Sequence, residues 1–181
     1  VIGFGSGFNF YPVGVIATSL HVVLSEGSYM DVKFPTHGVY EEVYIVGLDT
    51  QSDLAVLRIK GKNLPTIKTM RSVEVEVGDK VFTISNPEGY VNTMSEGIVS
   101  AARIIDGELL YQISAPISQG SSGGAVFNEF GEVVGVVAAT SITGQNLNFA
   151  VPVEELDTIK AFETSITLKE INEYLKTNSK N

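Results

Sequence analysis

Short runs of apolar residues, separated by glycine, proline, asparagine and aspartate, cover most of the chain and predict β-strands. The runs form two series, one before residue 60 and one after residue 80. Residues 63–76 between them are polar, contain a proline and show no sustained period. Strands at short, regular intervals with turn residues between them are typical of barrels and sandwiches. The pattern therefore predicts an all-β chain with two lobes. The expected strands are residues 1–10, 15–18, 29–34, 39–48, 54–59, 80–85, 93–102, 109–114, 125–127, 133–139 and 146–151.

The period changes after residue 152. Val153, Leu156 and Ile159 recur at the spacing of a helix face. Thr167 and Glu170 then form the pattern of a capping box, which begins a helix. We expect residues 153–181 to form a helical tail that packs on the second lobe.

Composition removes several classes of function. The chain has 181 residues, no cysteine and two histidines, so neither a disulfide nor a His/Cys zinc site is available, and we expect no cofactor or metal. A net charge of −9 argues against nucleic acid as a partner. No apolar run reaches the length of about 18 residues that suggests a membrane-spanning helix. No targeting signal is visible in the chain.

The stretch 119–125 has the residue types that an exposed nucleophile needs. Ser122 is surrounded by glycines, which permit unusual backbone angles and allow neighbouring N–H groups to converge on one point. A flexible turn is the alternative interpretation. The stretch also matches the nucleophile elbow of α/β-hydrolases, but that fold requires a histidine after the serine. Both His21 and His37 precede Ser122, so this class is excluded.

Two other positions are candidates for the same chemistry. His21 follows a strand and has apolar neighbours on both sides, so it is either a core histidine or a general base. Asp49 and Asp53 precede the apolar strand 54–59, and either could orient a histidine. Asp53 is nearer the apolar run and is the better candidate. His37 lies beside a glycine at an expected hairpin tip and is given no role.

The order histidine, aspartate, serine is that of the trypsin-like fold. The residues around these positions resemble the HtrA/Deg serine proteases over about residues 1–156. The matching stretches are residues 5–8, 18–23, 52–57, 86–87 with 97–101, 120–125 and 148–152. The resemblance implies a trypsin-like double β-barrel with C-terminal helices and a site between the barrels. It implies a first barrel over residues 1–68, a connection over 69–78, a second barrel over 79–152 and the tail over 153–181.

The resemblance also implies roles. Ser122 would attack a peptide carbonyl, His21 would transfer the proton, and Asp53 would orient His21. The N–H groups of Gly120 and Ser122 would form the oxyanion hole. The substrate pocket would be lined by uncharged residues, which favours small to medium aliphatic residues before the cleaved bond. These pocket residues are Ile117, Ala138, Ala139, Thr140, Leu147 and Phe149.

Some residues depart from the family pattern. Ser121 stands where HtrA proteases usually carry asparagine, and Ser19 where they carry asparagine or alanine. Ser121 is neutral and cannot form an ion pair with a charged N-terminus, so we do not expect the first residues to act as an activation terminus. The chain also ends before a PDZ domain would fit. The resemblance further implies polypeptide substrates that are unfolded or damaged, a homotrimer, no membrane insertion and an extracytoplasmic location. The alternative is a catalytically silent barrel that acts as a peptide-binding or chaperone-like module.

Overall fold

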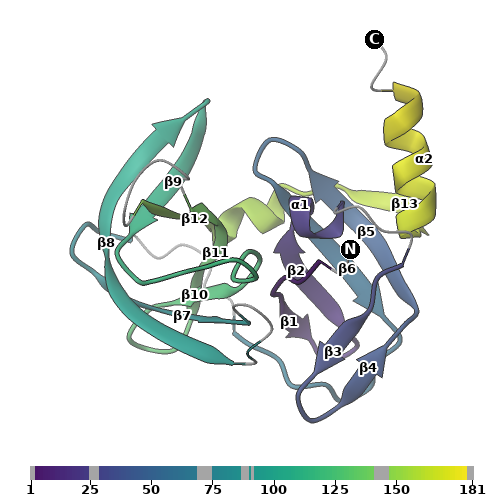
Figure 1. The fold of residues 1–181 in the computed structure, drawn as a ribbon, viewed down its shortest axis with the longest axis horizontal. Helices are drawn as coiled ribbons and strands as arrows, with labels where there is room; N and C mark the ends of the chain where they lie inside the picture. Colours follow the sequence, from purple (N-terminus) through teal and green to yellow (C-terminus); the bar gives the residue numbers. More distant parts are fainter. Residues whose placement is uncertain are drawn as a thin grey trace.

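The computed structural model describes residues 3–24, 29–68, 75–86, 90, 92–140 and 147–178, and leaves out the side chains of 139–140 and 174–178. The expected connection over 69–78 is therefore described only in its last four residues. The described chain forms two lobes of β-structure that lie side by side (Figure 1).

The first lobe contains a five-stranded sheet in the order β1-β2-β6-β5-β13 and a separate hairpin of β3 and β4. Alternate residues of its strands face the lobe interior: Ile16 of β2 and Leu57 of β6 belong to one buried cluster, with Ile45 of β5. A single helical turn, α1, follows β2. The bounds are β1 Phe8–Tyr11, β2 Val15–Ser19, α1 Leu20–Val23, β3 Val32–Phe34, β4 Gly38–Tyr40, β5 Val43–Asp49, β6 Leu54–Ile59 and β13 Ala161–Ile166.

The second lobe is a closed barrel in the order β10-β11-β12-β9-β8-β7. Its longest strand, β8, continues beyond the barrel and returns through a tight turn at Asp106 and Gly107, with φ of 52° and 90°. Positive φ at both central residues suits the right-handed twist of a hairpin. The bounds are β7 Lys80–Ser85, β8 Thr93–Ile105, β9 Glu108–Ile113, β10 Ala125–Phe127, β11 Val133–Thr140 and β12 Asn148–Pro152.

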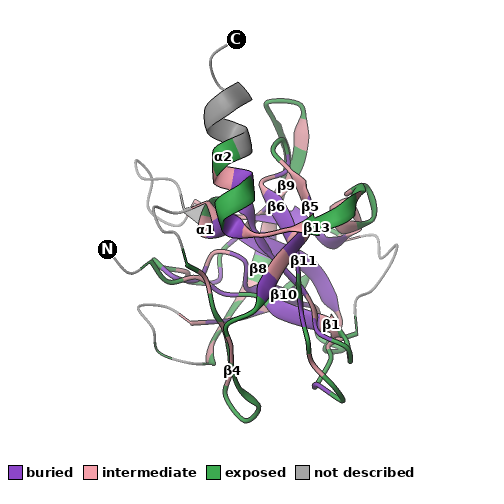
Figure 2. Cartoon of the chain, turned by 90° about the vertical axis from the view of Figure 1, so that its right-hand side faces the viewer, coloured by how far each residue is buried: buried purple, intermediate pink, exposed green. Residues whose placement is uncertain are grey.

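A second buried cluster joins the lobes. Ala17 of β2 and Leu54 of β6 face away from the first-lobe interior and pack with second-lobe residues such as Val136. Figure 2 shows the resulting concentration of buried residues around β10 and β11, in contrast to the exposed tip of the β3–β4 hairpin. Strands β2 and β6 of the first-lobe sheet are thus buried on both faces, which holds the lobes together over apolar surface.

The prediction of a helical tail on the second lobe is wrong beyond its first turn. The 3-10 helix η2, Val153–Asp157, does bury Val153 in the cluster between the lobes. The chain then forms β13, which pairs with β5, and α2, Leu168–Asn178, whose Leu168 and Ile171 join the first-lobe core (Figure 1). Pairing with β13 satisfies N–H and C=O groups that the outer edge of β5 would otherwise leave open.

The beginning of α2 is as the sequence predicts. Glu170 Oε2 accepts hydrogen bonds from Thr167 N and Oγ1, both at 2.7 Å, and Glu170 N donates to Thr167 Oγ1 at 3.4 Å. These bonds lower the pKa of Glu170 below its ordinary value. The capping box is therefore formed and directs α2 back over the first lobe.

Leu168→Ala should reduce the free energy of unfolding by about 2–5 kcal/mol, the usual range for a buried leucine. Leu168 is only 6% exposed among first-lobe residues. Denaturant unfolding measures the change, with Leu109→Ala, at a position 37% exposed, as the matched control. Equal and small effects of the two substitutions would contradict the packing of α2 on the first-lobe core.

Candidate functional site

His21 lies on α1 at the surface between the lobes. Leu20 and Val23 of the same turn are buried in the first-lobe core, which directs His21 outward. About half of the His21 side chain is exposed, at 49%. The interpretation of His21 as a core histidine is therefore excluded, and its ring is accessible to a ligand.

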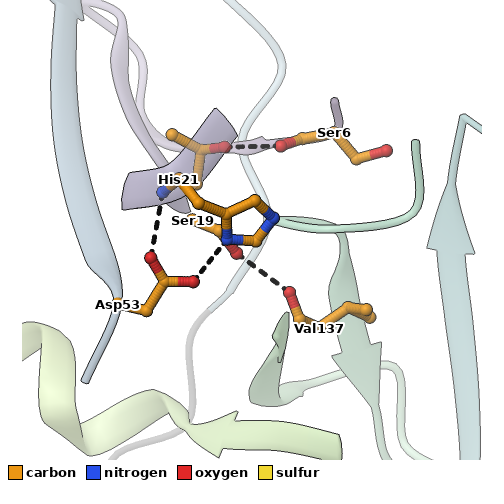
Figure 3. A network of polar contacts seen from close by, with 6 residues as sticks. Ser6, Ser19, His21, Asp53 and Val137 are labelled. Atoms are coloured by element: carbon orange, nitrogen blue, oxygen red, sulfur yellow. Dashed lines mark hydrogen bonds and ion pairs between the residues drawn. The ribbon is translucent and has the colours of Figure 1, made fainter. Parts of the chain in front are cut away.

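Asp53 holds His21 through two contacts (Figure 3). Asp53 Oδ1 accepts a hydrogen bond from His21 N at 2.9 Å, and Asp53 Oδ2 lies 2.5 Å from His21 Nδ1. Leu20 N also donates to the Asp53 carbonyl at 2.8 Å. With Nδ1 engaged, Nε2 is the ring nitrogen left for a proton transfer. Of the two acids that the sequence left open, Asp53 is the one that contacts the histidine.

Asp49 shapes the turn that carries Asp53. Its two carboxylate oxygens accept hydrogen bonds from Gln51 N and Ser52 Oγ, both at 2.9 Å. Within this turn Asp53 adopts a left-handed backbone conformation with φ of 55°. A residue without a glycine's freedom stays in this region only when its surroundings hold it there. Asp49 therefore supports the position of Asp53 and makes no described contact with the histidine.

The pKa of His21 is raised above its ordinary value of 6.5. The hydrogen bond to Asp53 is the largest cause, partial burial opposes it, and the negative charge of Asp53 adds to it. The pair thus favours the protonated ring. Because the folded-state pKa is raised, the pair contributes stability below pH 6.5 that is lost as pH rises through the folded-state pKa.

The loop that carries Ser122 has a tightly constrained backbone. Gly120 and Gly123 have φ of 92° and 84°, in the left-handed region. A Cβ at residue 123 would lie 2.2 Å from the Ser6 carbonyl oxygen and 2.9 Å from Ser19 N. Glycine is thus required at 123 on both grounds. The same contacts place the loop directly against the segment that leads to His21.

The N–H groups of this loop divide into two sets. Ser121 N donates to the Ser118 carbonyl, Gly123 N to the Val137 carbonyl and Gly124 N to the Ser121 carbonyl, at 2.8–2.9 Å. The N–H groups of Gly120 and Ser122 donate to no other described residue. These two are the residues predicted for the oxyanion hole.

Ser6 and Ser19 of the first lobe bind carbonyl groups across the boundary between the lobes, and Thr18 holds Ser6 within the first lobe. Ser6 N donates to the Ser122 carbonyl at 2.8 Å, and Ser6 Oγ to the Gly120 carbonyl at 2.7 Å. Thr18 Oγ1 donates to the Ser6 carbonyl at 2.7 Å, and Ser19 Oγ to the Val137 carbonyl at 3.1 Å (Figure 3). We call these contacts of Ser6, Thr18 and Ser19 the polar seam. No hydrogen bond links Ser122 Oγ to the His21 ring among the described residues.

A sequence profile of the trypsin-like peptidase domain matches residues 5–136, more than half of the chain. The chain belongs to the trypsin-like peptidase family. A putative serine protease, HhoB, of Synechocystis sp. is 34% identical over 160 residues, covering 84% of this chain and 38% of that protein. A probable periplasmic serine endoprotease, DegP-like, of Chlamydia pneumoniae is 36% identical over 158 residues, covering 82% of this chain and 32% of that protein.

Solved structures of this family give the same result. The serine endoprotease from Yersinia pestis superposes with a TM-score of 0.77 at 34% identity, over 85% of this chain and 55% of that one. An HtrA-type protease, AlgW, with a decapeptide also gives 0.77, at 32% identity, over 84% and 49%. The predicted HtrA/Deg kinship and all-β, trypsin-like fold are confirmed. The chain spans about a third of the curated relatives' length and about half of the solved chains.

The residues predicted for the substrate pocket of this trypsin-like peptidase lie on the second lobe. Ile117 packs against the barrel core, and Ala138 packs against the cluster between the lobes. Leu147 and Phe149 are half-buried beside β11. Ala139 and Thr140 belong to β11, but their side chains lie outside the described residues.

Asn148 lies between the predicted pocket residues Leu147 and Phe149, in the same expected wall of the pocket. It is 4% exposed, and its Nδ2 donates to the Ala115 carbonyl at 2.8 Å. It thereby fixes β12 to the segment that leads towards residue 117. Ser121, at the family's usual asparagine position, is also buried, and its Oγ accepts hydrogen bonds from Ser85 Oγ and Ser118 N.

Other features of the chain do not extend this site. His37 lies at the β3–β4 turn, as the sequence predicts. Its Nδ1 is 2.8 Å from Thr36 Oγ1. Within the described ranges, no three or more His, Asp or Glu side chains are grouped to hold a metal ion. None of the described helices is long and apolar enough to cross a membrane.

The His21 pKa should fall when Asp53 is replaced by asparagine. Asp53→Asn removes the negative charge and the strong acceptor that favour the protonated ring. Imidazole resonances followed by NMR between pH 4 and 9 measure the pKa, with His37→Gln to assign the signals. An unchanged His21 pKa in Asp53→Asn would contradict the contact between the two side chains.

Proposed function

We propose that the chain is the protease domain of a serine endopeptidase that cleaves polypeptides through an acyl-enzyme. The observation that carries this proposal is the paired contact of Asp53 with the backbone and ring of His21. Beside it lies a loop whose Gly120 and Ser122 N–H groups donate to no residue in the described part of the chain. Orientation of a histidine by a carboxylate and an oxyanion site beside a serine are the parts that acyl transfer requires.

In the proposed reaction, Ser122 Oγ forms a bond to the peptide carbonyl carbon while its proton passes to His21 Nε2. The carbonyl oxygen takes the negative charge and accepts hydrogen bonds from Gly120 and Ser122 N–H. Collapse breaks the C–N bond, and His21 gives the proton to the departing amine. A water molecule then attacks the ester carbon and gives its proton to His21. The bond from that carbon to Ser122 Oγ breaks, His21 returns the proton to Oγ, and the carboxylic acid product leaves. Asp53 stays ionised and stabilises the imidazolium.

Support for Ser122 as the nucleophile comes from the contacts of its loop. The Ser122 carbonyl binds Ser6, and Gly123 lies against Thr18 and Ser19, only two to three residues before His21. The chain segments that carry the two groups are therefore neighbours. In the proposed reaction the hydrogen bond between Ser122 Oγ and His21 Nε2 forms when substrate binds, as catalytic hydrogen bonds often form fully only in the complex.

The substrate class follows from the relatives and from the pocket. Relatives are named periplasmic serine endoproteases, and one solved relative holds a decapeptide. We propose that this protein likewise acts outside the cytoplasm, on unfolded or damaged polypeptides. We also propose that it forms a homotrimer. The proposed pocket contains no charged residue, so a buried arginine or lysine of the substrate would lose its hydration without compensation. An aliphatic side chain would gain about 0.8 kcal/mol per buried CH₂.

A fluorophosphonate should label the protein once per chain, at Ser122, and Ser122→Ala should prevent labelling. Loss of the nucleophile should lower peptide turnover on the order of 10⁶-fold without unfolding the protein, because Ser122 is only half-buried and the substitution removes one oxygen atom. Mass spectrometry and circular dichroism measure both. A folded wild-type protein that is neither labelled nor active would instead support the silent, peptide-binding alternative.

Cleavage of an unbiased peptide library should occur after valine, alanine, isoleucine or leucine, and rarely after charged residues. The reason is the uncharged pocket, whose Ile117 and Leu147 also narrow it against large aromatic residues. Product sequencing by mass spectrometry gives the preference. Predominant cleavage after arginine or lysine would reject the pocket while leaving the triad intact.

A further inference from the structure

Ser6 makes four hydrogen bonds, and three of them cross to the second lobe. Its amide donates to the Ser122 carbonyl, and its hydroxyl donates to the Gly120 carbonyl and accepts from Asn86 N at 2.8 Å. Its carbonyl accepts from Thr18 Oγ1. The side chain is 5% exposed, so water does not replace these bonds easily. Because Asn86 N–H occupies one lone pair of Oγ, the single hydroxyl proton is directed to Gly120.

These bonds fix two peptide planes of the Ser122 loop. A trans peptide is planar, and its C=O and N–H point in opposite directions. The Gly120–Ser121 peptide is held by Ser6 Oγ at its carbonyl and by the Ser118 carbonyl at its N–H. The Ser122–Gly123 peptide is held by Ser6 N at its carbonyl and by the Val137 carbonyl at its N–H.

The peptide between these two planes carries the Ser122 N–H. Its carbonyl, that of Ser121, accepts from Gly124 N at 2.9 Å, so the Ser122 N–H points the other way. Gly120 N–H precedes the first fixed plane, and a glycine with φ of 92° would be free to rotate without it. One first-lobe residue therefore holds the peptide planes on both sides of the Ser122 N–H, and the plane that directly follows the Gly120 N–H.

We propose that Ser6 is a positioning residue of the oxyanion site, holding the Gly120 and Ser122 carbonyls so that the neighbouring N–H groups stay directed at the substrate carbonyl. This role rests on the proposed function. Ser6 touches neither substrate nor the reacting atoms, and acts only through the loop. Since Thr18 binds the Ser6 carbonyl three residues before His21, the same residue also sets the distance between the histidine and serine segments.

Ser6→Ala tests the role. The variant leaves the Gly120 carbonyl and Asn86 N without their partner but keeps the backbone bond to Ser122. Misplaced oxyanion donors affect the transition state more than the bound substrate, so kcat should fall roughly 10- to 100-fold. KM should stay within about threefold. Ser6→Cys keeps a weak donor of similar shape and should recover part of kcat.

Ser19→Ala is the matched control. It removes another buried hydroxyl-to-carbonyl bond of the polar seam, one that ends at the Val137 carbonyl. That carbonyl keeps its backbone bond from Gly123 N in the variant, so the bonds that hold the peptide planes of residues 120–123 are all retained. It should lower the free energy of unfolding by a similar amount to Ser6→Ala and keep kcat within about threefold, because the loop planes stay fixed. Equal kcat values in the two variants would overturn the positioning role.

Amide hydrogen exchange gives a readout that does not need turnover. In Ser6→Ala, the Ser121 amide should exchange at least about tenfold faster relative to the Val126 amide of the barrel core, and in Ser19→Ala it should not. An unchanged Ser121 rate in Ser6→Ala overturns the inference even if the protein proves inactive. Conversely, a labelled, active wild type with an unaffected Ser6→Ala rejects this inference alone and leaves the proposed function standing.

Discussion

The candidate site is divided between two lobes, with His21 and Asp53 on the first and Ser122 on the second, so its geometry depends on how the lobes are held in register. Two kinds of contact do this. The cluster that contains Ala17, Leu54 and Val136 removes apolar surface from water, which gives cohesion but little directional control. The polar seam supplies direction, because each hydroxyl must meet one particular carbonyl at 2.7–3.1 Å. Both kinds of contact are buried at one boundary. A small displacement of one lobe relative to the other is therefore unfavourable, because the displacement would expose apolar surface and leave polar groups unpaired.

Within the first lobe, the histidine and aspartate behave as one unit. Residues 20 and 21 make three contacts with Asp53, through two backbone amides and one ring nitrogen. The left-handed conformation of Asp53 is unfavourable by about 1 kcal/mol or more, and the turn bonded by Asp49 maintains it. The remaining freedom of the site is therefore the position of the Ser122 loop relative to this unit. Ser6 lies between the Ser122 loop and the strand before His21, so its hydrogen bonds restrict movement of the loop relative to His21 and Asp53.

Local patterns in the sequence were sufficient for most of the strands, although the expected strand 39–48 forms two, β4 and β5. They also gave the order of His21, Asp53 and Ser122 and the capping box at Thr167. Each of these depends on residues close together in the chain. Ser6 was missed because its side-chain partner at Gly120 is 114 residues away and is a backbone carbonyl, which every residue possesses. Strand β13 was missed because its six residues are exposed or half-buried and show no alternation, so its pairing with β5 leaves no mark on the pattern. The spacing of Leu168 and Ile171 suits one apolar face of α2, but an apolar face does not specify which lobe it covers.

The chemistry of the polar seam also separates two responses to pH. Its bonds join hydroxyl and amide donors to carbonyl acceptors, none of which titrates in the range where His21 does. The register of the lobes should therefore persist across neutral pH, while the charge of the His21–Asp53 pair changes within it. If the buried seam were made of carboxylates, acid would move the lobes and the histidine together. A carboxylate contact between the lobes does exist, from Gln51 Nε2 to Glu108 Oε1, but it lies at the exposed surface. With uncharged bonds in the polar seam itself, proton transfer at His21 is isolated from these bonds.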